Sequence, residues 1–364
     1  MSTHSASDGD DDEAVAGTRT KRVRLDGAAD GMPEELLPSE FATRELSWAT
    51  VFPNPKMLAM VLNIVHAVLG DAVTFTVTKD AAGQGALTIN ILAQSSSVLV
   101  LVYLPCPHVV VEGPRPAVQV TVPKVQLRTM LSKISGALAL YQTLTGPASA
   151  RVQMTVETPM GGRHMELSIM EPVQGFATTE MHYGCQLSLV VSHLQGELES
   201  VGTASDGFVD IEVCDAGRKG DMVLVLRGEA TLGLSESHIF LPALAEPLAA
   251  AGAAGGGGGA GDPVQGHLQV HAHAKCRMDS SASRKFTTAS VKALPRLFVG
   301  RYKLATLTTV LNNMRGESMV DLCLGGAGDQ AGHAVPMLVR MPIDYLQGGY
   351  ITFAIAPKVD EDAP

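Results

Sequence analysis

The amino-acid sequence predicts an α+β fold made of two similar domains. Short runs rich in Val, Leu and Ile, which are typical of strands, alternate with a few segments whose apolar residues recur at helical spacing. A strand, a helix, several strands, a second helix and more strands follow one another once before residue 165, and the same order returns after it. Aromatic residues make up only 4% of the chain, so the core must be built from aliphatic side chains.

The first forty residues differ from the rest in charge and periodicity. They contain ten acidic residues against four basic ones, which supplies −6 of the net charge of −10. Such a segment cannot bury enough apolar surface to fold, so residues 1–40 are predicted to be a disordered acidic tail. The body is only mildly acidic, which argues against a protein that coats nucleic acid with its whole surface and leaves room for one basic face.

A short basic cluster, Lys21-Arg22-Val23-Arg24, lies inside this tail. Basic clusters on flexible arms serve as nuclear import signals, as nucleic-acid contacts or only as solubilising charge. The cluster resembles the Myc-type import signal, with Arg24 where that signal usually has Lys. We therefore expect the protein in the nucleus.

From Phe41 onward the chain predicts strands in most of its length. Their bounds are Val73–Val77, Ala86–Leu92, Val98–Leu104, Ala117–Val122, Arg151–Val156, Met165–Ile169, Gln186–Val190, Val209–Val213, Met222–Arg227, His267–Cys276, Met319–Leu324, Pro336–Met341 and Tyr350–Ala356.

Helical spacing occurs in four segments, Asn54–Leu69, Pro123–Leu138, Val191–Val201 and Val299–Arg315. The first opens with Asn-Pro, a capping residue followed by proline at the first helical position. By contrast, Ala249–Gly261 contains only Ala and Gly, so we expect a flexible insert in a loop of the second domain.

The charges of the four helical segments favour contact with phosphates. Three of them contain bases and no acid, whereas the third contains Glu197 and Glu199. Solvated helix faces usually mix both signs, because opposite charges one turn apart attract, and that ordinary reading remains the alternative. The candidate phosphate contacts are Lys56, Lys124, Arg128, Lys133, Arg301, Lys303 and Arg315. With few side chains suited to reading bases, the predicted partner is duplex DNA bound without regard to sequence.

The segment Tyr350–Asp362, which reads YITFAIAPKVDED, resembles the last strand and acidic end of the proliferating cell nuclear antigen (PCNA) family of DNA sliding clamps. Weaker similarities occur in the family's order: Phe41–Leu46 resembles its opening strand, Pro123–Ile134 its second helix, and Ala334–Val339 a late strand. Together they cover the chain from about Phe41 to Asp362. The departures suggest a divergent member, such as one from a large DNA virus.

The resemblance implies the DNA clamp fold, with two helices on antiparallel sheets in each domain and a closed trimeric ring with helices lining the hole. It places domain 1 at residues 41–168, the connector at 169–182 and domain 2 at 183–364. It also implies a non-enzymatic processivity factor that tethers DNA polymerase and other replication and repair proteins through clamp-binding peptide motifs, and that is placed on DNA by a clamp loader.

Family members bind partner peptides in a hydrophobic pocket between the connector, the last strand and a nearby loop. The matching positions here are Leu92, Val98, Met170, Val173, Phe176, Pro336, Ala356 and Pro357. Ordinary core packing is the alternative for these residues. Ala354 stands where the family usually has an aromatic residue, so the choice of partner peptides is left open.

Other kinds of site are not favoured. His267, His271, His273 and Cys276 have metal-binding composition, but no carboxylate supports them and alternating His-Ala-His is typical of a half-exposed strand. No catalytic or cofactor-binding motif occurs, and no apolar run reaches the roughly 18 residues that span a bilayer. The five scattered cysteines indicate a reducing compartment. A checkpoint-type clamp subunit in a hetero-oligomer and a nuclear scaffold that does not encircle DNA remain alternatives.

Overall fold

The computed structural model of the chain describes most of the sequence after residue 45. The described residues are 46–52, 55–65, 71–79, 85–92, 98–106, 109–111, 117–132, 138–143, 151–158, 161–170, 180–201, 207–217, 220–230, 233–244, 268–279, 286–314, 316, 318–326, 335–343 and 349–358. The acidic tail, the basic cluster at residues 21–24 and the Ala/Gly insert lie outside them.

The first half of the described chain contains nine strands and two helices. They are β1 (Leu46–Phe52), α1 (Pro55–Val65), β2 (Ala72–Lys79), β3 (Gly85–Leu92), β4 (Val98–Cys106), β5 (Val109–Val111), β6 (Ala117–Pro123), α2 (Lys124–Leu131), β7 (Leu138–Thr143), β8 (Arg151–Thr158) and β9 (Gly161–Ser168). Proline at the first position of α1 fits the expected start of that helix, since its ring fixes a helical φ and it lacks an N–H that would go unbonded.

The second half contains nine strands and three helices within the described residues. They are β10 (Glu180–Val190), α3 (Val191–Val201), β11 (Phe208–Asp215), β12 (Met222–Ala230), β13 (Gly233–Leu241), β14 (Gln269–Arg277), α4 (Thr288–Lys292), β15 (Arg296–Lys303), α5 (Leu304–Asn312), β16 (Met319–Gly326), β17 (Met337–Pro342) and β18 (Tyr350–Ile355).

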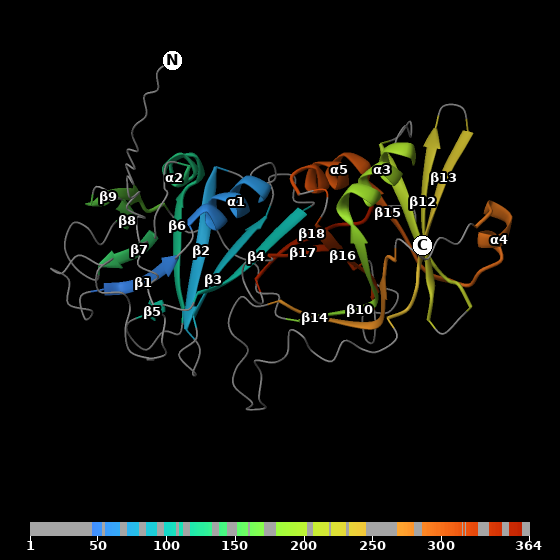
Figure 1. Ribbon diagram of the computed structural model, residues 1–364, viewed down its shortest axis with the longest axis horizontal. Coiled ribbons are helices and arrows are strands. Elements are labelled where there is room, and N and C mark those ends of the chain that lie inside the picture. The colour runs from blue at the N-terminus through green and yellow to red at the C-terminus, as the bar shows by residue number, and fades with distance from the viewer. Residues whose placement is uncertain are drawn as a thin grey trace, which may run out of the picture. The chain divides into compact units, whose positions relative to one another are not determined.

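The two halves repeat one strand order. In the first half the sheets run β5-β1-β7-β8-β9 and β6-β2-β3-β4, and in the second half β14-β10-β16-β17-β18 and β15-β11-β12-β13. Single backbone hydrogen bonds repeat as well: the N–H of Lys124, which opens α2, donates to Asp71, and that of Leu304, which opens α5, donates to Gly207, both at 2.9 Å. The helices α1, α2, α3 and α5 lie on one side of the strands (Figure 1). The expected α+β architecture of two similar units is therefore confirmed.

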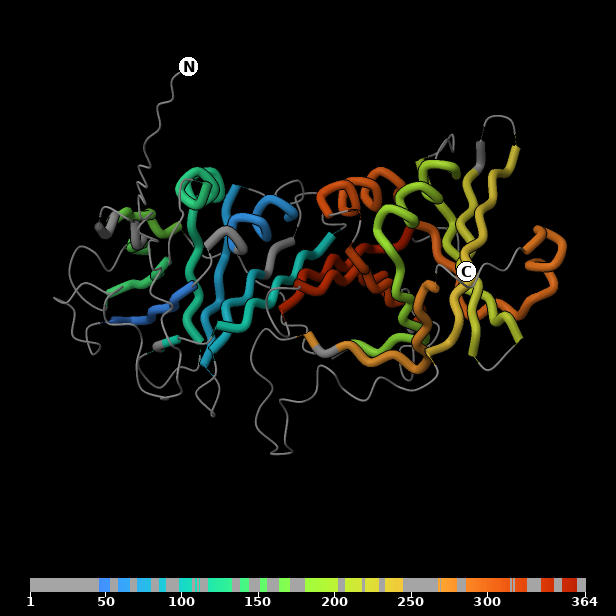
Figure 2. Tube along the Cα trace, viewed as in Figure 1, coloured from blue at the N-terminus to red at the C-terminus, as the bar shows by residue number. Residues whose placement is uncertain are grey.

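One strand pair joins the halves. β18 of the second half pairs antiparallel with β4 of the first, from Tyr350 opposite Tyr103 to Ile355 opposite Val98. This pairing merges two of the four sheets into one of nine strands, which can be followed through the centre of Figure 2. The two halves consequently share a backbone hydrogen-bond ladder as well as side-chain contacts.

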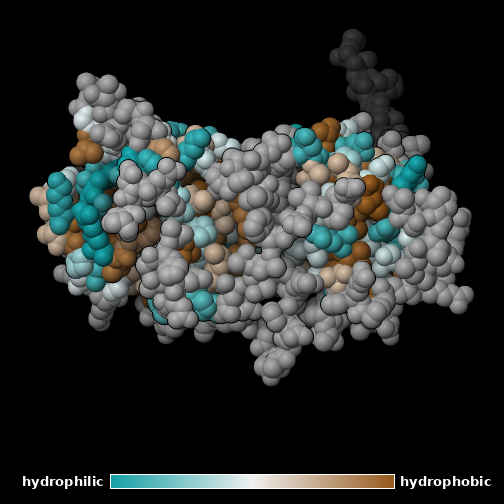
Figure 3. All heavy atoms as spheres, turned by 180° about the vertical axis from the view of Figure 1, so that it is seen from behind, coloured by the Kyte–Doolittle hydropathy of each residue, from teal (hydrophilic) through white to brown (hydrophobic). Residues whose placement is uncertain are grey.

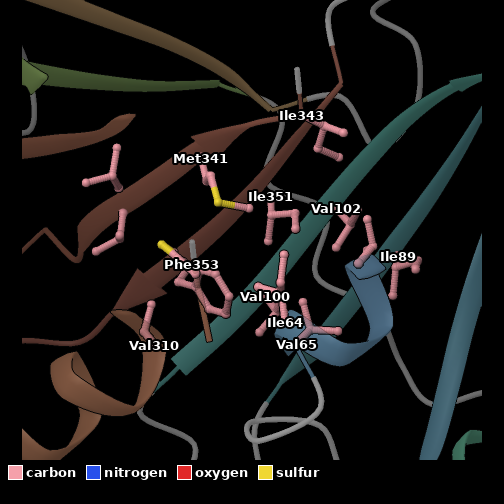
Figure 4. Packing of buried hydrophobic residues seen from close by; sticks show 14 of the residues in the cluster. Ile64, Val65, Ile89, Val100, Val102, Val310, Met341, Ile343, Ile351 and Phe353 are labelled. Carbon is pink, nitrogen blue, oxygen red and sulfur yellow. The ribbon is translucent and has the colours of Figure 1, made fainter. Parts of the chain in front are cut away.

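The apolar core lies between this sheet and the helices. At the junction, Val100 and Val102 of β4 meet Ile351 and Phe353 of β18, and all four side chains are at most 2% exposed. Figure 4 shows them next to Ile64 and Val65 of α1, with Val310 of α5 on the other side of Phe353. The core is aliphatic, as the composition requires.

Two of the helices in the structure are shorter than the sequence predicted. The segment Val299–Arg315 was expected to be helical, but residues up to Lys303 belong to strand β15 and the helix α5 begins only at Leu304. Lys303 has extended backbone angles, φ −69° and ψ 115°, and the strand passes into the helix without a turn residue that would mark the boundary. The segment Pro123–Leu138 likewise ends as a helix at Leu131, and β7 begins at Leu138.

The cysteines are all free and buried. Burial raises the pKa of Cys106 to about 11 and that of Cys185 to about 12, which keeps these thiols protonated and unreactive at neutral pH. Among the described helices, none combines the length and the apolar composition needed to cross a membrane.

Candidate nucleic-acid interface and partner surface

The helices of the first half contain bases and no acid. Arg128 of α2 is exposed, and its Nε donates to Oδ1 of Asn63 on α1 over 2.9 Å, so the guanidinium is held across both helices. Lys124 begins α2, but it is only 9% exposed, so it presents little of its charge to solvent, contrary to the expected phosphate contact. Lys56 lies in α1. No acid occurs in α1 or α2, so the exposed charge that the described residues show on these two helices is the positive charge of Arg128.

The helices of the second half carry a different charge. α5 contains no charged residue, and α3 contains Glu197 and Glu199. Glu197 accepts a hydrogen bond from Ser237 and lies 3.7 Å from His193, so part of its charge is compensated within the chain. Lys303 is exposed at the end of β15, directly before α5. The positive surface therefore belongs mainly to the first half.

Arg301 does not join the helical bases, which corrects the sequence-based expectation. It lies in β15, where alternate side chains face opposite sides of the sheet. Tyr302 points into the helix-packed core, so Arg301 points to the other side, where its Nε lies 3.7 Å from Asp210 and its guanidinium 5.7 Å from the centre of the Phe208 ring. Lys133 and Arg315 lie outside the described residues.

The nine-stranded sheet has a second apolar cluster on the face opposite the helices, which we call the helix-free face. The cluster, here named the helix-free cluster, consists of Leu101, Tyr183, Leu268, Cys323, Leu338 and Ala354. Each of these side chains is at most 7% exposed, and Leu99, Met181 and Val335 pack around them. The cluster takes residues from β4, β10, β16, β17 and β18 and therefore spans the junction of the halves.

The residues expected to form a partner pocket lie partly around this cluster. The carbonyl of Pro336 accepts a 2.9 Å hydrogen bond from the hydroxyl of Tyr183, and Ala356 is exposed just after β18. Met170 is 41% exposed, but its N–H donates to Thr121 of β6, an end strand of the sheet three places beyond β4, so it lies away from this cluster. Pro357 follows Ala356 and is partly buried.

Of the four other expected pocket residues, Val98 is the one whose side chain the structure describes, and it does not reach this surface. Val98 is only 2% exposed and belongs to the helix-side core, so it does not border a pocket on the helix-free face, which corrects its assignment. Val173 and Phe176 lie outside the described residues, and Leu92 ends β3.

Sequence reasoning missed Leu99, Leu101, Tyr183, Leu268 and Leu338. The signal was present in β4, which reads Val-Leu-Val-Leu-Val-Tyr-Leu from residue 98. A strand that is apolar at every position is buried on both faces, whereas a strand with one solvated face alternates. The apolar run in β4 therefore indicates that both faces of the strand are buried, and the helix-free cluster covers the second face.

The four-stranded sheet β13-β12-β11-β15 carries an ion-pair network on its face away from the helices. Arg227 of β12 donates to Glu212 of β11 and to Glu236 of β13, and Glu236 also contacts His238. These four side chains are between 6% and 14% exposed. Figure 3 shows hydrophilic residues gathered over the end of the molecule that carries β12 and β13. Arg296 of β15 adds a 3.6 Å contact to Glu212, so the network links all four strands of this sheet and is structural.

The histidine cluster does not form a metal site among the described residues. His271 stacks on His182 of the neighbouring strand, with ring centres 5.0 Å apart, and Cys276 is buried with its Sγ 3.2 Å from the carbonyl of Gly220. His267 lies outside the described residues. Within them, no group of three or more His, Cys, Asp or Glu side chains is arranged to hold a metal ion.

Comparisons with known proteins identify the fold. The chain matches the structure of PCNA from Thermococcus kodakaraensis with a TM-score of 0.55 and 11% identity over 85% of this chain and 100% of that one. It matches a PCNA2–PCNA3 complex from Sulfolobus tokodaii (TM-score 0.51, 13% identity, 86% and 100% covered) and proliferating cellular nuclear antigen from Entamoeba histolytica (0.54, 10%, 86% and 100%). No protein-family model and no curated protein sequence matches. The chain therefore has the clamp fold of PCNA structures.

The buried network predicts the effect of Arg227→Ala. The substitution removes the buried cation that Glu212 and Glu236 share and leaves Glu212 with the half-exposed Arg296, so we expect the free energy of unfolding to fall by about 3–5 kcal/mol in urea at pH 7. Arg151→Ala, which breaks the exposed pair with Glu166 on β8 and β9, should cost less than about 1 kcal/mol. Equal losses in the two variants would contradict the structural role of the network.

The pH dependence of stability should change in the same variant. Burial raises the pKa of Glu236, but hydrogen bonds from Arg227 and His238 outweigh burial and hold that pKa below the usual 4.5. A carboxylate with a lowered folded-state pKa stabilises the protein above its unfolded pKa, and this stabilisation is lost as the pH falls through the folded value. As the pH falls through the folded-state pKa of Glu236, the free energy of unfolding, measured in urea, should therefore decrease less in Arg227→Ala than in the unaltered protein.

Proposed function

We propose that this chain is a DNA sliding clamp, a non-enzymatic processivity factor that encircles duplex DNA and holds replication and repair proteins on it. The observation that carries the proposal is the repeated clamp fold together with its charge: the helices share one side of the strands, and those of the first half carry bases and no acid. Weak contacts between these bases and phosphates would be screened by salt, so topology rather than affinity would keep the ring on DNA.

The free strand edges support ring formation by copies of the chain. Within the described sheets β9 and β13 are end strands, and the strands that take their places in the other half, β18 and β4, pair with each other. If β9 of one copy pairs with β13 of the next, the contact between chains repeats the pairing of β18 with β4 inside each chain. Such a head-to-tail contact closes into a ring when the rotation fits, and we propose a homotrimer, which gives six similar units around the hole.

The exposed apolar residues support the same contact. Leu234 at the start of β13 is 79% exposed, the largest exposed fraction among the large apolar side chains of the described chain. An exposed strand edge with an apolar residue is a surface that proteins normally cover.

The remaining parts of the proposal concern partners and compartment. We propose that polymerase and other clamp-binding peptides dock on the helix-free face near Pro336, Ala356 and Pro357, and that a loader opens the ring. The basic cluster Lys21–Arg24 supports a nuclear location. The second candidate is a subunit of a hetero-oligomer, which the similarity to a complex of PCNA2 with PCNA3 favours.

DNA contact is tested by Arg128→Ala combined with Lys303→Ala. We expect weaker binding to linear duplex DNA, onto which a ring threads at the ends. The slope of log affinity against log salt should fall by about one for each phosphate contact removed. Lys292→Ala is the control, because Lys292 is exposed on α4, which packs on the face of its sheet away from the other helices. An unchanged slope in the double variant would show that these bases do not face DNA.

The variant Leu234→Asp tests ring formation, and Leu297→Asp is its matched control. Both residues are exposed on end strands of the same sheet, Leu297 at 53% in β15. We expect the purified chain to have the mass of three copies by size-exclusion chromatography with light scattering. A charge at residue 234 should shift it to one copy, because a buried unpaired carboxylate opposes the contact. A monomeric parent chain supports the hetero-oligomer, and a trimer that survives Leu234→Asp but not Leu297→Asp contradicts the proposed edge.

A further inference from the structure

Leu268 occupies the helix-free face at the junction of the halves. It is 1% exposed and packs with Leu101 of β4, Leu338 of β17 and Ala354 of β18. It comes from the chain segment that leads into β14, and Val270 and Ala272 of that strand pack against the same cluster. Alternate residues 268, 270 and 272 therefore cover the helix-free cluster as an extended apolar strip.

The side chain of Tyr350 holds the backbone of Leu268. The N–H of Leu268 donates to the hydroxyl of Tyr350 over 3.0 Å, and that hydroxyl donates back to the carbonyl of Leu268 over 3.2 Å. Burial raises the pKa of Tyr350 to about 12, so the hydroxyl keeps the proton that it donates. Tyr350 is itself fixed by a stacked Tyr103 ring and by Arg340, whose guanidinium lies 3.9 Å from its ring centre. The site can pair with any extended backbone that offers one N–H and one C=O.

The two ends of β14 differ in how they are held. At the far end, Cys276 lies in the helix-side core, pairs with Ala243 and lies within 3.2 Å of the carbonyl of Gly220. At the near end, β14 is the last strand of the sheet, and its one neighbour, β10, runs parallel to it. Parallel pairs are slightly weaker than antiparallel ones, and an end strand has one ladder instead of two. Figure 1 shows this part of β14 running on the side of β16–β18 away from α3 and α5.

The chain that precedes Leu268 is long enough to let it leave and return. Leu244 donates to the carbonyl of Lys275, and Leu268 lies seven residues before Lys275, or roughly 23 Å along a strand. In the sequence, 23 residues separate Leu244 from Leu268, among them the Ala/Gly run 249–261. Fully extended, that many residues reach roughly 80 Å, which is more than three times this distance. The connection is therefore long enough for Leu268 to leave the cluster while the covalent link keeps it nearby.

We propose that the Leu268–Ala272 segment is a removable plug on the helix-free face, and that an extended partner peptide with an apolar side chain binds there by displacing it. The incoming side chain takes the position of Leu268, and the incoming backbone takes over the two hydrogen bonds to Tyr350. The proposal rests on the helix-free face being the partner surface of the clamp proposed above. Such a plug would make the face selective for tightly binding peptides, because each peptide must compete with the Leu268–Ala272 segment of the same chain.

Thiol labelling of Cys323 tests whether the plug opens. Cys323 belongs to the helix-free cluster and is 1% exposed, so it reacts only when the cluster opens. In the native protein treated with iodoacetamide and analysed by mass spectrometry, we expect Cys323 to react faster than Cys106, which is buried in the helix-side core. Leu268→Ala should speed the reaction of Cys323 about thirtyfold or more and leave Cys106 unchanged, since loss of a packed leucine side chain favours the open state.

A matched variant separates local opening from general instability. Leu241→Ala removes a fully buried leucine of β13 from the helix-side core and should speed the labelling of Cys106 and Cys323 alike. If Leu268→Ala also speeds both thiols equally, or speeds neither, the segment is not an independent plug and the proposal fails.

A peptide of the chain itself tests the exchange. The probe is a fluorescent peptide of residues 264–274, followed by anisotropy, with the same peptide carrying Asp at the leucine position as its control. The probe should bind Leu268→Asp at least tenfold more tightly than the unaltered protein, in which the tethered segment competes, and the control peptide should bind neither. Equal binding to both proteins, or no binding to a folded Leu268→Asp whose Cys106 stays protected, contradicts the exchange. Neither experiment contains DNA or depends on a ring, so a failed plug and a failed clamp give different results.

Discussion

The antiparallel ladder between β4 and β18 is the interaction on which the rest of the structure depends. It joins the halves through six residue pairs, from Tyr103 opposite Tyr350 to Val98 opposite Ile355. On one face of this ladder, Val100, Val102, Ile351 and Phe353 build the core beneath the helices. On the other face, Leu101 and Ala354 build the helix-free cluster. The same pairing leaves β9 and β13 as end strands, so the contact that the chain makes once internally is the contact that it offers to another copy.

Much of the fold was predictable because local patterns agree with the tertiary structure. α3 begins and ends as expected at Val191 and Val201, and most aliphatic runs became strands. Missed strands include β5 and β7, which are aliphatic but short, and β13 and β15, which lack a clear aliphatic signal. β13 reads Gly-Leu-Ser-Glu-Ser-His-Ile-Phe-Leu, because its polar residues enter the ion-pair network, and β15 passes into α5 with no Gly, Pro or Asn to mark the end of the strand. Register and neighbours in the sheet, rather than local propensity, determine such segments.

The candidate site was only partly predictable for a related reason. Helical spacing correctly placed Arg128 on a helix, but the same assumption placed Arg301 there, and one strand residue turned toward Asp210 instead. Charge balance along a sequence reports which segments are basic, whereas the face that a base occupies depends on whether the segment is helix or strand. The helix-free cluster depends on contacts such as Tyr183 with Pro336, 153 residues apart, which no local pattern contains.

The central claim is that bases on the helices face a hole enclosed by several copies of the chain. An electron cryomicroscopy structure of the purified oligomer tests it most directly. The account predicts a closed ring of three copies, with β9 of each copy paired to β13 of the next and Arg128 on the inner wall. A ring with Arg128 on its outer wall, or an open row of copies, would contradict it.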